Sequence, residues 1–237
     1  MKCSKNGNEA IELLDKGYVR LVDTMGDDRT VANAARVSFD RRTDELNDKD
    51  KRLIAFLARE GHDSPFRHAS LQFEVYAPLM IARQWWKYQI GSNNSEYSAW
   101  NESSRRYITE KEEFYIPGAD EWRSYPENVK QGSGEPISEY NGGAWTADLK
   151  EYIEQGEYLY NESIKQGIAP EQARLFLPSY GMYVRWYWTA SLQSVAHLIK
   201  QRTADDAQYE FRLYANAVKE LAHSKFPVSL NELLKER

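Results

Sequence analysis

The sequence predicts one mixed α+β domain that spans residues 1–237. Three observations support this prediction. A chain of 237 residues fits one large domain or two small ones. Short segments with a two-residue hydrophobic period, typical of strands, are interspersed with longer segments of helical pattern. No internal repeat or linker divides the chain, so a single domain is the simplest interpretation.

The first half of the chain carries clear helix and strand signals. Residues 18–22 alternate like a short strand, and residues 71–75 repeat that pattern. Asp and Asn residues that cap helix N-termini precede two helical segments, and Pro78 suits the first turn of a third. Gly61 should end the second of these helices. We therefore expect helices at residues 31–39, 51–59 and 79–86, and a turn at residues 64–66.

The second half begins with loop-like sequence and ends in helices. Residues 90–98 and 117–143 are rich in Gly, Ser, Asn or Pro and should form loops. Residues 183–189 are aromatic and β-branched, which favours a strand. Helical patterns cover residues 147–166, 170–176, 191–202 and 205–224. Pro227 is expected to mark the stop after the last of them.

Composition limits the classes of function. The net charge of −5 argues against a general nucleic-acid binder, because no basic face runs along the chain for phosphates. Basic residues are nevertheless concentrated at 83–87 and 105–106, which suits a small anionic ligand. The aromatic share of 13% favours ring-shaped ligands or a wet subunit interface.

The single cysteine, Cys3, lies near an N-terminus that we expect to be frayed. One cysteine cannot form a disulfide within the chain, which fits a reducing compartment. Residues 1–12 are too polar for a signal peptide, and no apolar run approaches membrane-spanning length. We therefore expect a cytoplasmic protein without membrane contacts.

Common metal and phosphate motifs do not occur in the sequence. The four histidines show no HxxxH spacing, so we predict no metal site. Neither GxGxxG nor GxxxxGK[ST] is present, so side chains would have to bind any phosphate. Glu102, Ser104 and Arg106 would face one side of an extended segment and offer an acceptor, a donor and a cation to one ligand. Both basic segments also have a plainer interpretation. Residues 102–106 could form a solvated surface, and residues 83–87 could form the end of a helix whose tryptophans lie in the core.

Several blocks of the sequence, from about residue 31 to the C-terminus, resemble the flavin-dependent thymidylate synthases. In family order they are NAARVS (33–38), HDSPFRH (62–68), AP (77–78), ARQW (82–85), NE-x-S-x-RY (101–107), AR (173–174), LP (177–178), WT (188–189), Arg202 and AQ-x-E (207–210). One block could match by chance, but this many in register form a specific signal.

The family signature is RHR, a short spacer and then S-x-N-E-x-S-x-R, and this chain departs from its first half. Lys87, Tyr88 and Gln89 occupy the RHR positions, the spacer is longer, and Ala99 replaces the first serine. The second half of the signature is intact. A role for the longer loop in covering folate or flavin is a hypothesis that deletion of residues 90–96 would test.

The resemblance implies a dUMP site that contains one catalytic residue. The implied dUMP-binding residues are Gln84, Lys87, Glu102, Ser104, Arg106, Arg174 and Arg202. Arg202, the catalytic residue, would lie at the uracil edge and favour ionisation at N3, because a fixed cation stabilises the developing anion. The plainer interpretation is an arginine that complements a helix dipole at its C-terminus.

The resemblance also implies an FAD site. Its positions here are His62, Ser64, Lys87, Tyr88, Gln89, Glu102, Ser191, Gln193 and His197. Tyr88 could stack on a ring and Gln89 could form a hydrogen bond, but neither carries the charge of the residue that it replaces. We expect His68, beside a predicted strand, to be a structural histidine.

The implied reaction is the reductive methylation of dUMP to dTMP. 5,10-Methylenetetrahydrofolate would transfer its one-carbon unit to C5 of dUMP, NADPH would reduce FAD, and reduced FAD would provide the hydride that completes the methyl group. The other class of thymidylate synthase needs a cysteine nucleophile, for which Cys3 is a poor candidate. The family fold, helices on a small antiparallel sheet, assembles as a homotetramer with active sites between subunits.

Two alternatives to this enzyme remain. One is a non-catalytic nucleotide-binding descendant of the family, suggested by the replaced RHR motif. The other is a flavin reductase that acts on a different acceptor.

Overall fold

A six-stranded antiparallel sheet forms the centre of the fold. The computed structural model describes residues 2–5, 8–37, 41–89, 100–103, 112–127 and 132–235. The strands in spatial order are β1 (Lys2–Lys5), β2 (Asn8–Leu13), β3 (Gly17–Met25), β4 (Ser70–Pro78), β6 (Tyr183–Ser191) and β5 (Trp100–Glu102). The three strands predicted from the sequence are confirmed as parts of β3, β4 and β6, whereas β1, β2 and β5 were not predicted. The N-terminus is not frayed as expected, because Cys3 pairs with Ala10 in the sheet.

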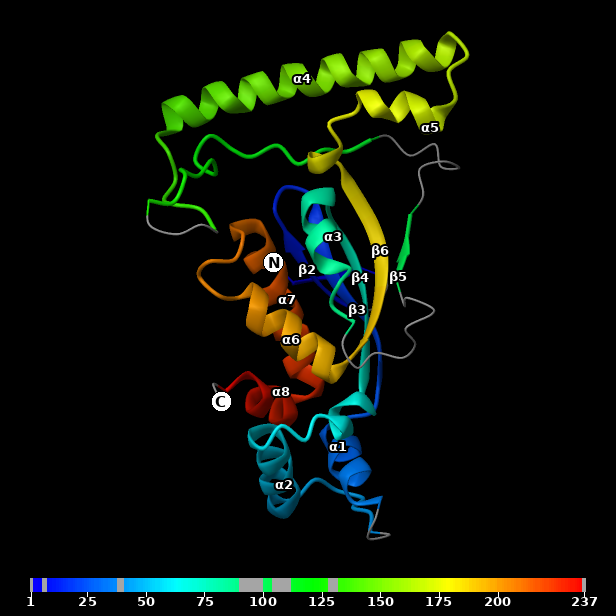
Figure 1. Cartoon of the computed structure of the whole chain (residues 1–237), viewed down its shortest axis with the longest axis vertical. Helices are drawn as coiled ribbons and strands as arrows, with labels where there is room; N and C mark the ends of the chain where they lie inside the picture. Colours follow the sequence, from blue (N-terminus) through cyan, green and yellow to red (C-terminus); the bar gives the residue numbers. More distant parts are fainter. Residues whose placement is uncertain are drawn as a thin grey trace.

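Helices pack on one face of this sheet, as Figure 1 shows. That face is built by alternate strand residues, for example Leu71, Phe73 and Val75 of β4, which are fully buried. The helices that cover it are α6 (Leu192–Arg202) and α7 (Tyr209–Lys225), and α8 (Pro227–Leu234) packs against both of them. Farther along, α1 (Asp28–Ala35) and α2 (Asp48–Arg59) pack against α8, and α3 (Leu79–Trp85) continues directly from β4. The predicted α+β architecture is confirmed.

An outer layer crosses one end of the molecule (Figure 1). It consists of α4 (Glu139–Lys165), α5 (Pro170–Ala173) and the short 3₁₀ segment η3 (Arg174–Phe176). The helix α4 begins at Glu139 rather than at the predicted residue 147, because Ser138 caps it by accepting from the Asn141 N–H, and Gly142 packs its backbone against Ala119. A Cβ on Gly142 would lie 1.8 Å from the Ala119 carbonyl oxygen, so only glycine fits there. No helix in the described part of the chain is long and apolar enough to cross a membrane.

Two further predictions of helix boundaries need correction, and one prediction needs an addition. The helix predicted at 31–39 is α1, which ends at Ala35 with Arg36 as its C-cap, and residues 38–40 lie outside the described residues. The helix predicted at 205–224 begins at Tyr209. Pro227 follows the end of α7 at Lys225, as predicted, and it also begins α8, which was not predicted, since proline suits the first helical position. The expected turn at 64–66 is the 3₁₀ segment η2 (Ser64–Arg67), and the predicted loop at 90–98 lies outside the described residues.

The N-terminus of α8 is capped by Asp28, a residue distant in the sequence. The Asp28 carboxylate is 4% exposed and accepts hydrogen bonds from the backbone N–H groups of Val228, at 2.8 Å, and Ser229, at 2.7 Å. This carboxylate joins α1 to α8 and complements the positive end of the α8 dipole.

Replacing Asp28 with alanine should therefore lower the free energy of unfolding by about 2–3 kcal/mol, because two buried N–H groups lose their acceptor. Urea unfolding measures the change. Asp48→Ala is the matched control, since the Asp48 side chain is 81% exposed, and it should change stability by no more than about 0.5 kcal/mol. Equal effects of the two substitutions would contradict the capping role of Asp28.

Candidate active site

Arg202 occupies the last turn of α6, held between two aromatic side chains. Its Nε atom donates a hydrogen bond of 2.6 Å to the Tyr88 hydroxyl. Its guanidinium carbon lies 5.5 Å from the Tyr88 ring centroid and 5.2 Å from that of Phe211. Both rings are buried, so they fix the direction of the arginine. The position also fits the plainer prediction of an arginine at a helix C-terminus, but the contacts with Tyr88 and Phe211 go beyond that role.

A chain of polar side chains leads from α3 to the start of α7. Gln84 donates to the Met80 carbonyl oxygen, at 3.2 Å, and through the same Nε2 atom to Oε1 of Gln208. Gln208 in turn donates to the Glu210 carboxylate at 2.9 Å. Gln208 and Glu210 were not predicted as site residues, although their block AQ-x-E was part of the family resemblance. That block was the only signal in the sequence that could have identified them.

Gln208 and Glu210 also line a cavity of about 590 Å³ between α4 and the body of the fold. Its lining includes Met80, Tyr115, Trp122, Arg123 and Ile153. Burial raises the pKa of the Tyr115 hydroxyl, and the nearby Glu121 and Glu210 carboxylates raise it further. The hydroxyl therefore stays protonated at neutral pH. Apolar walls with a few amide, hydroxyl and guanidinium groups are typical of sites for flat polar ligands.

Four of the nine residues predicted for FAD lie on η2 or on α6 and its N-cap: Ser64, Ser191, Gln193 and His197. Ser191 caps α6, and its hydroxyl accepts a hydrogen bond of 3.2 Å from the Ser194 N–H. Gln193 accepts a 2.7 Å hydrogen bond from Nε of Arg67, which ties η2 to α6. The His197 ring lies 5.6 Å from the Tyr88 ring at a tilt of 53°. The helix α6 thus connects the predicted flavin residues at its N-terminus to Arg202 at its C-terminus.

Other predicted FAD residues lie on the surface around this helix. His62 and Ser64 are exposed, and the His62 ring packs edge-on against Phe56 at 5.6 Å. Lys87 is exposed, and the Gln89 amide donates to the Trp86 carbonyl oxygen at 2.9 Å.

The tryptophans that precede the replaced RHR motif have different environments. Trp85 is fully buried among Trp186, Trp188 and Phe211, as the plainer interpretation of this helix predicted. Trp86 is not in the core as that interpretation required. It is 41% exposed, and the Arg83 guanidinium lies 4.6 Å from its ring centroid.

The structure does not bring every predicted residue to this cluster. Glu102 lies on β5, paired with Trp186 across the sheet, and Ser104 and Arg106 lie outside the described residues. Arg174 is exposed in the outer layer, where it donates to the Glu171 carbonyl oxygen at 3.2 Å. Within the described residues no three His, Cys, Asp or Glu side chains are grouped as a metal ion would require.

Comparisons with known proteins show the family to which the chain belongs. Residues 20–228 match the family model described as "Thymidylate synthase complementing protein". The chain is 38% identical over 224 residues to a flavin-dependent thymidylate synthase of Thermus thermophilus, covering 94% of this chain and 77% of that one. The chain belongs to the flavin-dependent thymidylate synthase family.

Other members and a solved structure extend this result. A flavin-dependent thymidylate synthase of Thermosipho africanus is 36% identical, with 94% of this chain and 93% of that one covered. The crystal structure of PolB, a UMP/dUMP methylase from Streptomyces cacaoi bound with 5-Br dUMP, superposes with a TM-score of 0.77 at 28% identity. That match covers 94% of this chain and 96% of PolB. The fold of the chain is therefore that of these enzymes over nearly its whole length.

For this member of the flavin-dependent thymidylate synthase family, we expect Tyr88→Phe to lower turnover by about tenfold. The substitution keeps the ring and removes the hydroxyl that accepts from Arg202, a loss of about 1.5 kcal/mol for a hydrogen bond to a charged group. Steady-state kinetics and thermal unfolding of the purified variant measure the effect. A merely structural tyrosine would lower stability without changing the kcat, and that outcome would contradict a positioning role.

Proposed function

We propose that this chain catalyses the reductive methylation of dUMP to dTMP. FAD is its bound cofactor, NADPH its reductant and 5,10-methylenetetrahydrofolate its one-carbon donor. The observation that carries the proposal is Arg202, oriented by Tyr88 and Phe211 at one end of the helix whose other end holds Ser191 and Gln193.

The side chains around α6 fit a phosphate-bearing flavin. They offer hydroxyl, amide and imidazole groups at the N-terminus of a helix, where the dipole favours negative charge. His62, Ser64, Ser191, Gln193 and His197 would hold the cofactor, with the exposed Lys87 as an added cation. When bound, FAD supplies the hydride chemistry that these side chains lack.

The chain's own residues bind and polarise the nucleotide. The Arg202 guanidinium stabilises negative charge on the uracil ring as N3 loses its proton, which activates C5 towards the one-carbon unit. Gln84, whose amide nitrogen donates to Met80 and Gln208, presents its amide oxygen to the nucleotide, and Glu102, Ser104, Arg106 and Arg174 complete the binding set. Because Cys3 lies in an edge strand of the sheet, no step uses a cysteine nucleophile.

We propose further that the enzyme is a cytoplasmic homotetramer. The position of Arg174 supports the assembly, because this arginine lies in the outer layer and contacts no other predicted dUMP residue among those described. A second chain could supply Arg174 to a site whose Arg202 belongs to the first. Analytical ultracentrifugation measures the oligomeric state.

An absorbance spectrum of the purified protein, followed by product analysis, tests the function. We expect a flavin spectrum that is bleached by NADPH, and dTMP that forms only when dUMP and the folate are both present. UMP is tested beside dUMP, because PolB is described as a methylase of both. A protein that stays colourless with added FAD would contradict the proposal, and NADPH oxidation unaffected by dUMP would indicate a flavin reductase instead.

A further inference from the structure

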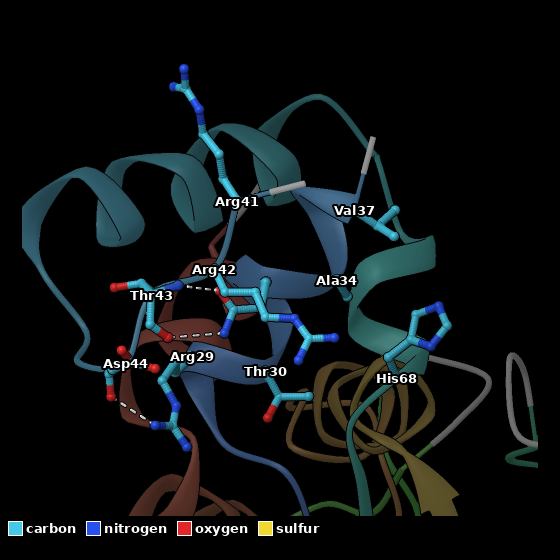
Figure 2. Close-up of a pocket in the computed structure, with 10 residues that line it drawn as sticks. Arg29, Thr30, Ala34, Val37, Arg41, Arg42, Thr43, Asp44 and His68 are labelled. Carbon is cyan, nitrogen blue, oxygen red and sulfur yellow. Dashed lines mark hydrogen bonds between the residues drawn. The ribbon is translucent and has the colours of Figure 1, made fainter. Parts of the chain in front are cut away.

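A second cavity lies between α1 and residues 41–44, and Arg202 is not among the residues that line it (Figure 2). Its volume is about 620 Å³. The lining comprises Arg29, Thr30, Asn33, Ala34, Val37, Arg41, Arg42, Thr43, Asp44 and His68. Three arginines and one aspartate line this space, and Figure 2 shows the Arg41 side chain extending away from the other labelled residues. None of these residues belongs to the predicted nucleotide or flavin sites.

Arg42 extends into this cavity from a fixed backbone. The Asn33 side chain donates to the Thr43 carbonyl oxygen at 3.1 Å and accepts from the Thr43 N–H at 2.9 Å, which attaches the segment to α1. Figure 2 shows the Arg42 guanidinium directed across the cavity towards His68. Within the described part of the chain, neither side chain has a hydrogen-bond or ion-pair partner. His68 is thus not the satisfied structural histidine that we expected.

The remaining charges leave this part of the cavity positive. Arg29 donates to the Asp44 carbonyl oxygen at 2.7 Å and lies 3.6 Å from the Asp27 carboxylate, so it is neutralised at the far side. Asp44 lies beside Arg29 in Figure 2, whereas Ala34 and Val37 form an apolar wall near Arg42. A planar cation beside an apolar wall and an imidazole suits a phosphate attached to an aromatic base.

The cavity borders the predicted flavin residues. His68 directly follows η2, which contains Ser64, and α1 packs against η2. Arg67, the residue before His68, is the one that hydrogen-bonds to Gln193 on α6. A ligand in the cavity would therefore lie beside these predicted flavin residues.

We propose that this cavity binds the 2′-phosphate of NADPH and that Arg42 selects NADPH over NADH. The inference rests on the proposed function, in which NADPH reduces the flavin. The 2′-phosphate is at the opposite end of NADPH from the nicotinamide, so a phosphate site beside the flavin leaves the nicotinamide free to reach it. An arginine commonly provides the 2′-phosphate contact in proteins that use NADP.

Binding of NADP⁺ and NAD⁺ to the FAD-loaded, full-length protein tests the proposal by isothermal titration calorimetry. The wild-type protein should bind NADP⁺ more tightly than NAD⁺. Arg42→Ala should weaken NADP⁺ binding by about ten- to a hundredfold and change NAD⁺ binding by less than about twofold. Arg42→Lys should bind NADP⁺ with an affinity between those of the wild type and Arg42→Ala, because lysine keeps the charge but loses the planar fork. Arg52→Ala, an exposed arginine of α2 outside the cavity, is the matched control and should change neither affinity.

Three outcomes would overturn the inference. First, the wild-type protein could show no preference for NADP⁺. Second, Arg42→Ala could weaken the binding of NADP⁺ and NAD⁺ equally. Third, Arg42→Ala could lose FAD, which would assign the cavity to the flavin. The KM values for NADPH and NADH in flavin reduction give a second measurement. Failure of the proposed function would appear separately, as the absence of dTMP from wild-type protein, because the affinity ratio is measured without turnover.

Discussion

Arg202→Ala should lower the kcat for dTMP formation by about 100- to 1,000-fold, the usual cost of removing one group that stabilises charge in the transition state. The Tyr88 hydroxyl and the Phe211 ring hold the guanidinium in one orientation, and alanine removes this fixed cation. Flavin content and dUMP affinity, measured on the same preparation, separate lost chemistry from lost binding.

The dependence on pH distinguishes a catalytic arginine from a structural one. A cation at the uracil edge lowers the pKa of N3, so removing it raises that pKa and leaves more of the substrate protonated at neutral pH. The residual activity of Arg202→Ala should therefore continue to rise at alkaline pH, where wild-type activity has levelled off. Arg212→Ala is the control, because Arg212 contacts Tyr209 and Asp205 on the same face of the fold but has no predicted role. A variant with an unchanged pH profile would argue against ionisation at N3.

The sequence predicted those strands whose own side chains show which face is buried. Residues 18–22 of β3 and 71–75 of β4 alternate because one face packs on helices, and β6 was predicted from its aromatic and β-branched residues. β1 and β5 have only four and three residues, and their pairing depends on neighbours rather than on their own pattern. The start of α8 was missed for a similar reason, because its cap is Asp28, at the other end of the chain.

The candidate site was predicted through the family resemblance, whereas its internal contacts were not. In the sequence, Tyr88 stands at an RHR position and lacks the charge of the residue that it replaces. In the fold its hydroxyl accepts from Arg202, which lies 114 positions later in the chain, and no local pattern reports such a pair. The Gln84–Gln208 contact also joins residues far apart in the sequence. Resemblance therefore named Arg202 and Gln84, and only tertiary structure showed what orients them.

Arg36→Leu is expected to lower the free energy of unfolding by about 3–5 kcal/mol at pH 7, because it leaves a buried carboxylate without its counter-ion. Arg36, in the matched block NAARVS, forms an ion pair with Asp50 of α2. The Asp50 side chain is fully buried and also accepts from the Asn47 N–H at 2.8 Å, so it cannot turn to solvent without losing the α2 cap. Urea unfolding measures the change, and Lys51→Ala, which removes only the exposed Asp48–Lys51 pair, should cost no more than about 0.5 kcal/mol.

The stability that Arg36→Leu loses relative to the wild type should become smaller as the pH falls. Burial opposes ionisation of Asp50, but the Asn47 N–H and the Arg36 guanidinium outweigh it and lower the pKa of the carboxyl below its usual value. A lowered pKa stabilises the fold above the unfolded value of about 3.9, and this stabilisation is lost as the pH falls through the folded pKa. In Arg36→Leu, burial raises the pKa instead, so protonation relieves the unpaired charge. The difference between wild type and variant should therefore shrink as the pH falls from 7 to about 4.

A second substitution separates the charge from the packing. Asparagine at position 50 keeps an oxygen for the Asn47 N–H but carries no charge, so Asp50→Asn should restore part of the stability of Arg36→Leu at pH 7. The same substitution in the wild-type background should be destabilising, because it leaves the Arg36 guanidinium without its partner. If the double variant were no more stable than Arg36→Leu alone, the loss would come from packing of the arginine side chain and not from the buried charge.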